Sequence, residues 1–441
     1  MSAAHPAKVE RLRAALAGAG QVALAKRSSN LFRDRAGAPA RRLDVRDFDA
    51  VLEFGPGWVE AEGMATYGAL VEACLARGCM PAVVPQLRSI TLGGAAAGVG
   101  IEATSFREGL VHHTLREIEV LTGSGEIVVA SPDNAHADLF FGFPNSYGTL
   151  GYALRLRAKT LPVKGYVQVE HRRFAGAPRF FEALAEVCAG GADFVDGVVF
   201  APDSLVLNVA RFAERAPWAS DYSFERIYYR SLLERELDYL TAGDYLWRWD
   251  TDWFWCSKNV GAQHPLLRRL YGRERLNSAF YTRIMRWNSR WGLTRALDAL
   301  TGWRAESVIQ DVDIPLARAP EYLDFMHREI GLLPIWVCPI GDPSPQWRFP
   351  LYPVAPRTTY VNFGFWDVKK TRERHPPGHF NRLIERKVAE LGGIKSLYSD
   401  AYFTREEFAR GYGGEAYAAL KARYDPRGTF KDLYEKCVLR A

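Results

Sequence analysis

The residues best suited to chemistry gather in the glycine-rich stretch 81–105, PAVVPQLRSITLGGAAAGVGIEATS. Gly93, Gly94, Gly98 and Gly100 carry no Cβ, so the backbone there can adopt conformations closed to other residues, and its N–H groups can approach a phosphate closely. The stretch contains neither a GxxxxGKS/T loop nor a GxGxxG pattern before a helix, which excludes both common nucleotide-binding loops. A turn of small residues in a tight core explains the glycines alone equally well.

A loop of basic and hydroxyl residues forms a second candidate phosphate site. Lys26, Ser28, Ser29 and Asn30 follow a short apolar strand that is predicted over 21–25. Positive charge and hydroxyl groups suit a pyrophosphate. A solvated basic turn is the alternative explanation of this loop.

A tryptophan-rich segment, 244–257, combines aromatic side chains with carboxylates. It contains four tryptophans and two candidate acids: Trp247, Trp249, Trp253, Trp255, Asp250 and Asp252. Alternate residues of a strand share a face, so a strand would separate most of the tryptophans from the two carboxylates, whereas aromatic side chains would surround a helix. Either arrangement suits a pocket for a large hydrophobic ligand. An aromatic cluster that seals the core between two domains is the alternative.

Regular elements must position these residues, and hydrophobic periodicity predicts them along the whole chain. In the first part we expect helices and paired strands: a helix over 8–19, strands over 51–54 and 58–61, a helix that Thr66 caps, and a hairpin around 123–125. After Pro162 strands alternate with helices: strands over 166–174, 194–200, 204–211, 334–338 and 358–365, and helices over 178–188, 320–330 and 379–391.

Length and composition limit the class of protein. A chain of 441 residues exceeds what one hydrophobic core usually supports, so two domains are expected. No apolar run approaches the roughly 20 residues that cross a bilayer, and the N-terminal residues lack a secretory pattern, so we expect a cytoplasmic protein. The six cysteines form no CxxC or Cys/His motif, which predicts reduced thiols and no metal site.

Positive charge is concentrated in residues 258–304, where ten Lys/Arg and two acidic residues give a net charge of +8. A helix is predicted over 277–300, with apolar residues at helical spacing beside arginines: Phe280, Ile284, Trp287 and Trp291 beside Arg283, Arg286, Arg290 and Arg295. Such a helix suits an anionic membrane interface, and we expect peripheral contact with the inner face of a membrane. A helix that packs on its own domain is the alternative. No nucleic-acid motif accompanies the charge, so no nucleic-acid partner is expected.

Several short motifs carry a resemblance to a known family. Read together with the glycine-rich stretch, the segments 109–113, 138–140 and 148–151 resemble the FAD-binding half of the vanillyl-alcohol-oxidase-type (PCMH-type) flavoproteins. The motifs VVPQL, TLGG, GVGIE and IWVCP are most similar to those of the delta-24 sterol reductase group. The resemblance implies a two-domain α+β fold with an FAD-binding α+β domain over 1–165 and a second α+β domain over 166–423, the substrate or cap domain. It also implies an aromatic helical insertion in the second domain at about 216–307, and a C-terminal segment, 424–441, that returns to the first domain.

The resemblance also implies which residues contact FAD. The cofactor-binding residues are expected in the first loop, the glycine-rich stretch and the later glycine motif: Lys26, Ser28, Ser29, Asn30, Thr91, Leu92, Gly93, Gly94, Gly98, Gly100, Ile101, Glu102, Ser105, Gly148, Thr149 and Gly151. In the resembling flavoproteins the first loop often supplies a histidine for a covalent flavin bond. This chain has no histidine there, so non-covalent FAD is expected.

By resemblance, the function is that of an FAD-dependent oxidoreductase that reduces a carbon–carbon double bond of a lipid, with NAD(P)H as electron donor. An isolated alkene needs a proton donor because no carbonyl stabilises a carbanion, and Asp250, Asp252 and Glu102 are the candidate acids. The four tryptophans would line the substrate pocket. The lipid is either a sterol-like side chain or a methylene-branched fatty acyl chain, and the second is favoured. The alternatives are an oxidase or dehydrogenase of an alcohol or lactone, and a membrane-associated flavin-binding protein without turnover.

Overall fold

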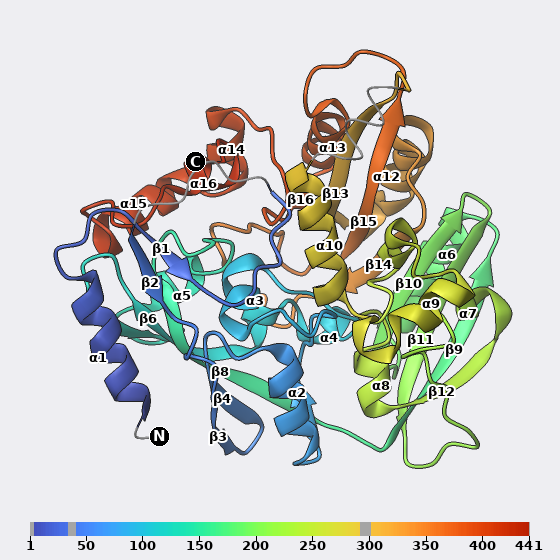
Figure 1. The fold of residues 1–441 in the computed structure, drawn as a ribbon, viewed down its shortest axis with the longest axis horizontal. Coiled ribbons are helices and arrows are strands. Elements are labelled where there is room, and N and C mark those ends of the chain that lie inside the picture. Colours follow the sequence, from blue (N-terminus) through green and yellow to red (C-terminus); the bar gives the residue numbers. More distant parts are fainter. Residues whose placement is uncertain (1–3, 34–40, 292–300, 441) are drawn as a thin grey trace.

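The computed structural model describes residues 4–33, 41–291 and 301–440, and its two large sheets stand side by side with helix α3 (Leu92–Gly98) between them (Figure 1). The first sheet is antiparallel, in the order β3-β4-β8-β6-β7, and β5 also pairs with β8. Its strands are β3 (Val51–Gly55), β4 (Trp58–Glu62), β5 (Cys79–Pro81), β6 (Leu115–Leu121), β7 (Ile127–Ala130) and β8 (Tyr152–Pro162).

The second sheet has eight antiparallel strands in the order β12-β9-β11-β10-β14-β15-β13-β16. Its strands are β9 (Tyr166–Phe174), β10 (Phe194–Ala201), β11 (Ser204–Ala213), β12 (Leu237–Thr241), β13 (Arg304–Pro315), β14 (Ile335–Ile340), β15 (Tyr360–Thr371) and β16 (Ile394–Lys395). The expected α+β fold with two sheets is confirmed. The exact domain boundaries stay a prediction.

The strand β14 shows how the second sheet uses its two faces. Ile335 and Val337 belong to the hydrophobic core beneath the outer helices, whereas Trp336 and Cys338 belong to the core shared with the first sheet. This is the two-residue alternation that a strand imposes. The outer helices are α6 (Ala177–Cys188), α12 (Ala319–Phe325) with its continuation η5 (Met326–Ile330), and α13 (His379–Glu390), with the short η4 (Leu316–Arg318) before α12.

The local predictions for the first part of the chain are confirmed in type, although the first helix spans Ala4–Leu16 and not 8–19. β3 pairs with β4 and β6 with β7, each across a tight turn. The Thr66 hydroxyl accepts a hydrogen bond from the Ala69 N–H (3.3 Å) and so caps α2 (Tyr67–Leu75). The remaining short elements here are β1 (Val22–Ala25), β2 (Arg41–Asp44), α4 (Ser105–Glu108), η1 (Val111–Thr114) and α5 (Ala137–Gly142).

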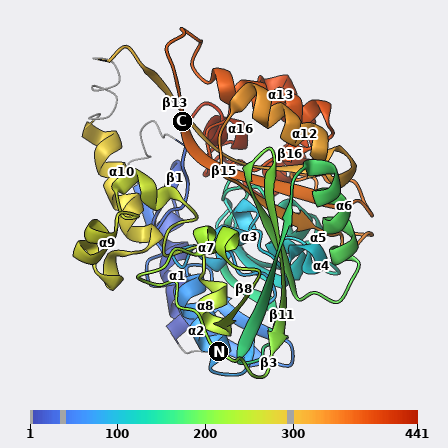
Figure 2. The ribbon, with the colours of Figure 1, turned by 90° about the vertical axis from the view of Figure 1, so that its right-hand side faces the viewer.

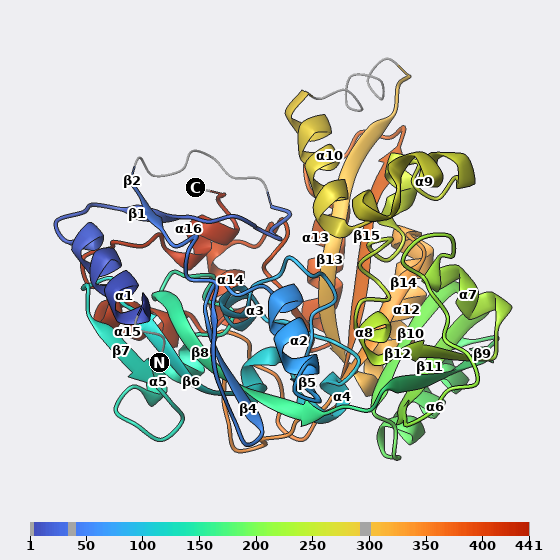
Figure 3. The same cartoon turned by 60° about the horizontal axis from the view of Figure 1, so that its bottom comes forward.

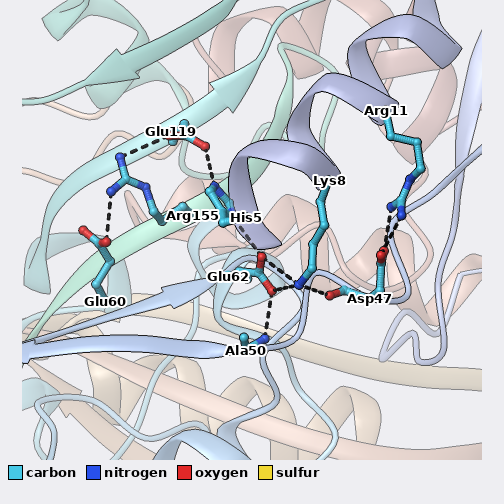
Figure 4. A network of polar contacts seen from close by, with 9 residues as sticks. All are labelled: His5, Lys8, Arg11, Asp47, Ala50, Glu60, Glu62, Glu119 and Arg155. Atoms are coloured by element: carbon cyan, nitrogen blue, oxygen red, sulfur yellow. Dashed lines mark hydrogen bonds and ion pairs between the residues drawn. The ribbon is translucent and has the colours of Figure 1, made fainter. Parts of the chain in front are cut away.

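The N-terminal helix α1 (Ala4–Leu16) is attached to the first sheet by a buried histidine (Figure 4). The two ring nitrogens of His5 contact Glu62 (2.7 Å) and Glu119 (2.9 Å), and Lys8 also bonds to Glu62 (2.7 Å). Burial lowers the pKa of His5, but the hydrogen bonds and charges of the two carboxylates outweigh it and raise this pKa to about 9. His5 is therefore an imidazolium at neutral pH and bridges two strands.

The last three helices of the described chain lie on the side of the first sheet (Figure 1), and the chain segment that holds them begins at Arg405. This segment contains α14 (Arg405–Gly411), α15 (Gly414–Tyr424) and α16 (Leu433–Cys437), which Figure 1 shows on the same side as β1 and α5. The Tyr424 carbonyl accepts a hydrogen bond from the Gly123 N–H (2.8 Å), and its hydroxyl donates to Asp138 on α5 (2.7 Å). These contacts bring residues about 300 positions apart together.

The tryptophan-rich segment adopts neither of the two expected elements. After α8 (Ala242–Leu246) the chain runs through turns to η2 (Cys256–Val260). The prediction of a strand or helix over 244–257 is wrong because Trp253 and Phe254 both have positive φ (43° and 58°), which breaks any regular element. The other helices of this region are α7 (Tyr228–Glu234), α9 (Pro265–Tyr271), η3 (Arg273–Arg275) and α10 (Ser278–Trp291). The predicted helix over 277–300 is confirmed as far as Trp291, and residues 292–300 lie outside the described residues.

Candidate active site

A cavity of about 380 Å³ lies between the two sheets. The first half of the chain contributes α3, the loop 26–33 and the loop 85–91. The second half contributes five aromatic side chains, two lysines and one carboxyl group: Trp253, Phe254, Trp336, Trp366, Tyr398, Lys431, Lys436 and Asp311. The wall from the first half thus combines glycine backbone, basic loops and aromatic side chains such as Tyr147 and Tyr152, and the wall from the second half is mostly aromatic.

The glycines of α3 serve both close packing and the cavity wall. A Cβ on Gly93 would lie 2.7 Å from the Gly63 carbonyl oxygen, and one on Gly94 would lie 2.8 Å from the hydroxyl oxygen of Thr91. That hydroxyl caps α3 by accepting the Gly94 N–H (3.2 Å). Close packing and a ligand-binding wall are therefore both compatible with these glycines, because the backbone that packs against Gly63 also lines the cavity.

The polar groups of the cavity fit a dinucleotide with phosphates. Arg33 Nη2 and Gln86 Nε2 are buried donors with no protein partner among the described residues, and both side chains line the cavity. Lys26, Lys431 and Lys436 line it as well and supply positive charge for a pyrophosphate. These residues could hold the phosphates and the acceptor atoms of FAD.

The loop of basic and hydroxyl residues is fixed against the loop that precedes α3. The Ser28 hydroxyl donates to the Ser89 carbonyl (3.1 Å), and the Ser89 hydroxyl donates to Asn30 (3.1 Å). Among the described residues, no histidine or cysteine lines the cavity. The arrangement is therefore compatible with the prediction of non-covalent FAD.

Most of the residues predicted to contact the cofactor line this cavity: Lys26, Ser28, Ser29, Asn30, Thr91, Gly93, Gly94, Gly98, Gly100, Ile101, Gly148 and Gly151. Leu92, Glu102, Ser105 and Thr149 do not line it. These four are fully buried, with Leu92 in the hydrophobic core and Thr149 donating to the Ser146 carbonyl (2.7 Å). Of the four tryptophans, only Trp253 lines the cavity.

Glu102 belongs to a buried charge cluster behind the cavity wall. Its Oε1 accepts a hydrogen bond from Arg248 (2.9 Å), and the same guanidinium nitrogen donates to Asp196 (2.8 Å). Asp196 also accepts hydrogen bonds from Asn208, Trp249 and Trp336, whereas Oε2 of Glu102 has no partner. Burial raises the pKa of Glu102 to about 7, against the opposing charge of Arg248. Glu102 thus joins the two halves of the chain through Arg248 and does not line the cavity.

Asp250 and Asp252 also point away from the cavity, contrary to their expected role as proton donors. Asp250 accepts hydrogen bonds from the Arg88 N–H (3.1 Å) and the Ser278 hydroxyl (2.6 Å). Asp252 forms a buried, two-point ion pair with Arg268 (2.6 and 3.0 Å). Their partners come from distant parts of the chain, so the carboxylates fix the tryptophan-rich segment in place.

The tryptophans form an aromatic cluster, as the alternative explanation had it. Trp249 stacks on Phe254 at 4.8 Å, and Phe254 lies 4.3 Å from Trp366 between ring centroids. Trp247 lies under the guanidinium of Arg88 at 4.7 Å. Among the described residues other than glycine, seven have positive φ, and four of these line the cavity: Val99, Tyr147, Trp253 and Phe254. Backbone strain of this kind gathers at functional sites.

The sequence interpretation missed Asp311, the carboxyl group that does line the cavity. Tyr398 donates a hydrogen bond to it and in turn accepts one from Trp366 Nε1 (2.9 Å), while Oδ1 of Asp311 has no partner. Burial raises the pKa of Asp311 to about 7, although the Tyr398 hydrogen bond opposes the rise. A signal was present in β13, where Asp311 and Asp313 alternate with buried apolar residues.

Comparison with known proteins agrees with this site. Residues 3–131 match the protein family described as an FAD binding domain. The first part of the chain is thus similar to the FAD-binding domain of PCMH-type flavoproteins, as the sequence motifs implied.

The chain is also similar to Delta(24)-sterol reductases over most of its length. It is 24% identical over 409 residues to a homolog from Caenorhabditis elegans, covering 86% of this chain and 75% of that protein. It is 24% identical over 420 residues to the Homo sapiens protein and 23% over 433 residues to the Arabidopsis thaliana protein, each time covering 89% of this chain and 76% of the relative. The resemblance to this reductase group is confirmed.

Proposed function

We propose that this protein reduces an isolated carbon–carbon double bond of a lipid, with FAD as cofactor and NAD(P)H as electron donor. The observation that carries the proposal is the position of Asp311, the one carboxyl group among the described residues that line the cavity, on a mostly aromatic wall. An apolar chain suits that wall. The similarity to Delta(24)-sterol reductases supports the same class of reaction.

Asp311 is the proton donor that we propose in place of the three expected acids. Bound FAD, once reduced by NAD(P)H, would supply two electrons as a hydride. Asp311 would hold a proton at the carboxyl and deliver it to one alkene carbon while the other carbon receives the hydride, so the π bond is replaced by two C–H bonds. A pKa near 7 keeps a large fraction of the carboxyl protonated at neutral pH. Tyr398, hydrogen-bonded to Asp311 and Trp366, would orient the carboxyl.

The aromatic side chains of the wall would orient the lipid and exclude water. Trp253, Phe254, Trp336 and Trp366 give this wall no acceptor and few donors, because Trp366 already donates to Tyr398 and Trp336 to Asp196 (3.2 Å). A water-poor site favours proton delivery from the carboxyl rather than from solvent. Of the two lipids, the methylene-branched acyl chain is the proposed substrate and the sterol-like side chain is its competitor.

Anaerobic stopped-flow spectroscopy tests the reaction. NADH or NADPH should bleach the flavin band of the purified protein, and a lipid with a methylene-branched acyl chain should then restore it. If a Δ24 sterol restored the flavin band instead, the proposed reaction would stand and the substrate would be a sterol. Bleaching by an alcohol or lactone would support an oxidase or dehydrogenase, and a flavin that responds to none of these compounds would support a binding protein without turnover.

A further inference from the structure

The short helix α9 (Pro265–Tyr271) exposes its leucines and buries an arginine. Its buried side chain is Arg268, whereas Leu266, Leu267 and Leu270 are 66%, 43% and 77% exposed. A helix on the surface of a globular protein normally buries its apolar side chains and exposes its arginines. The exposed leucines of α9 therefore call for a partner outside the chain.

The ion pair of Arg268 holds α9 in this orientation. The guanidinium contacts both oxygens of Asp252 (2.6 and 3.0 Å) and also donates to the carbonyls of Phe224, Arg226 (3.3 Å) and Ala262 (3.2 Å). A rotation of α9 that buried its leucines would separate the Arg268 guanidinium from these acceptors. Breaking a buried ion pair costs much free energy, so the contacts of Arg268 oppose this rotation. The exposure of the leucines is thus a fixed property of the fold.

Helix α10, which contacts α9, carries a further exposed aromatic side chain. The rings of Tyr271 and Phe280 contact each other at 5.8 Å and join α9 to the start of α10, and Trp287 further along α10 is 56% exposed. Figures 2 and 3 show both helices projecting at the same edge of the molecule. We call the exposed side chains Leu266, Leu267, Leu270 and Trp287 the α9–α10 face.

Positive charge surrounds this face. Arg269, Arg275 and Arg283 are exposed, and none of them forms an ion pair with another described residue, while Glu274 is the single acidic residue of 258–291. A second cavity, of about 490 Å³, lies beside α9 and is lined by five arginines and two glutamates: Arg226, Arg230, Arg235, Arg268, Arg269, Glu225 and Glu234. The partner must thus offer both apolar and anionic groups.

We propose that the α9–α10 face docks on the surface of a bilayer that contains anionic lipids. The leucines and Trp287 would enter the region between headgroups and acyl chains, and the arginines would lie at the level of the lipid phosphates. The face connects directly to the cavity wall, because Asp252 holds α9 and Trp253 lines the cavity. Docking would bring an acyl chain close to the site, although the inference does not depend on the proposed reaction.

Vesicle sedimentation tests the docking. Purified protein should sediment at low salt with vesicles of phosphatidylcholine and phosphatidylglycerol, much less with phosphatidylcholine alone, and should be released by high salt. The double variant Leu266→Ser/Leu270→Ser should partition at least about tenfold more weakly, since each leucine buries apolar area on binding. The control is Leu439→Ser, which changes a leucine that is 54% exposed and lies outside the face, and this variant should sediment like the wild type.

Charge reversal and oligomeric state complete the test. Arg269→Glu/Arg275→Glu should remove the preference for anionic vesicles, and the unchanged flavin spectrum of each variant would show that it folds. Wild-type protein that ignores anionic vesicles at low salt would overturn the docking proposal without touching the FAD assignment. A wild-type dimer that light scattering detects and that the leucine substitutions dissociate would also overturn the proposal, because the face would then bind a second copy of the chain.

Discussion

Asp311 carries the chemical part of the proposal at the scale of single residues. Its carboxyl lines the cavity, whereas Glu102, Asp250 and Asp252 do not line it and accept hydrogen bonds from residues outside it. A partly buried carboxyl with a pKa near neutrality, such as that of Asp311, can serve as an acid at the pH of a cell. The structure thus separates acids that hold the fold from one that could protonate a substrate.

Replacing Asp311 with asparagine should affect one half-reaction. Reduction of the flavin by NAD(P)H should stay near the wild-type rate, while reoxidation by the lipid should slow by about 10²–10⁴-fold, because the amide cannot donate a proton in the same way. In the wild type, the rate of reoxidation should fall as the pH rises through about 7, since the carboxyl then loses its proton. The variant should lack this pH dependence.

The control for that experiment is Asp313→Asn. Asp313 lies two residues along β13 but bonds to Tyr352 (2.7 Å) and Asn362 (2.7 Å) and does not line the cavity. Its replacement should lower stability and leave the pH profile of reoxidation in place. Equal loss of both half-reactions in Asp311→Asn would assign that residue to cofactor binding instead.

The flavin itself should be released by acid. Because no histidine or cysteine among the described residues lines the cavity, precipitating the protein with acid should leave intact FAD in the supernatant, which chromatography would identify. Flavin that stays with the precipitate would show a covalent bond and contradict the prediction.

At the scale of elements, buried ion pairs fix the position of helices whose hydrophobic pattern alone does not determine where they pack. The Asp252–Arg268 pair joins the tryptophan-rich segment to α9, and His5 joins α1 to two strands of the first sheet. Breaking such a pair leaves an uncompensated buried charge, so each pair can be tested through stability.

Asp252→Asn should lower the free energy of unfolding by about 3–5 kcal/mol, because Arg268 would remain buried without its carboxylate. Chemical denaturation would measure the loss. The matched control is Asp221→Asn, which breaks the exposed Asp221–Arg273 pair (3.0 Å) of the same region and should cost less than about 1 kcal/mol. A small loss in Asp252→Asn, together with slow lipid-dependent reoxidation in a folded variant, would restore Asp252 as a catalytic candidate.

His5→Gln should make the protein less stable by about 1–3 kcal/mol at low pH. The folded-state pKa of His5, about 9, exceeds its ordinary value of 6.5, so its contribution is complete below 6.5 and is lost as the pH rises through about 9. The difference in melting temperature between wild type and variant should therefore shrink over that range. The control is Arg11→Ala, which changes another residue of α1 and removes its exposed ion pair with Asp47 (2.7 Å; Figure 4). The difference in melting temperature between wild type and this variant should stay constant between pH 6.5 and 9.

At the scale of the whole molecule, the cavity and the Glu102–Arg248–Asp196 cluster both lie between the two halves of the chain. Glu102 follows α3 in the first half, Asp196 lies on β10 of the second sheet, and Arg248 comes from the tryptophan-rich segment. A ligand in the cavity contacts residues of both halves, so its binding should stabilise their association.

Removing FAD should lower the melting temperature of the whole protein. At a free FAD concentration of about 100 times Kd, binding adds about 2.7 kcal/mol to the free energy of unfolding. Protein stripped of flavin should melt earlier in a single broadened or two-step transition, and added FAD should restore the original curve. An identical melting curve with and without FAD would mean that the cofactor does not bridge the two halves.

The sequence by itself determined the local structure and one wall of the cavity. Alternation marked β9, β10, β11 and β14, Thr66 marked the start of α2, and the glycines of 93–100 pointed to a wall where backbone approaches a ligand. These features depend on residues a few positions apart, where period and capping act directly.

Only the tertiary structure decided which carboxyl group lies in the cavity. The sequence singled out Glu102, Asp250 and Asp252 as candidate acids and not Asp311, because the role of each acid depends on partners far along the chain, such as Arg248 for Glu102 and Tyr398 for Asp311. The orientation of α9 is a similar case, because the pairing of Arg268 with Asp252 outweighs the amphipathic pattern that would bury its leucines. Partner choice of this kind follows from how the two sheets and the tryptophan-rich segment pack, which no local period encodes.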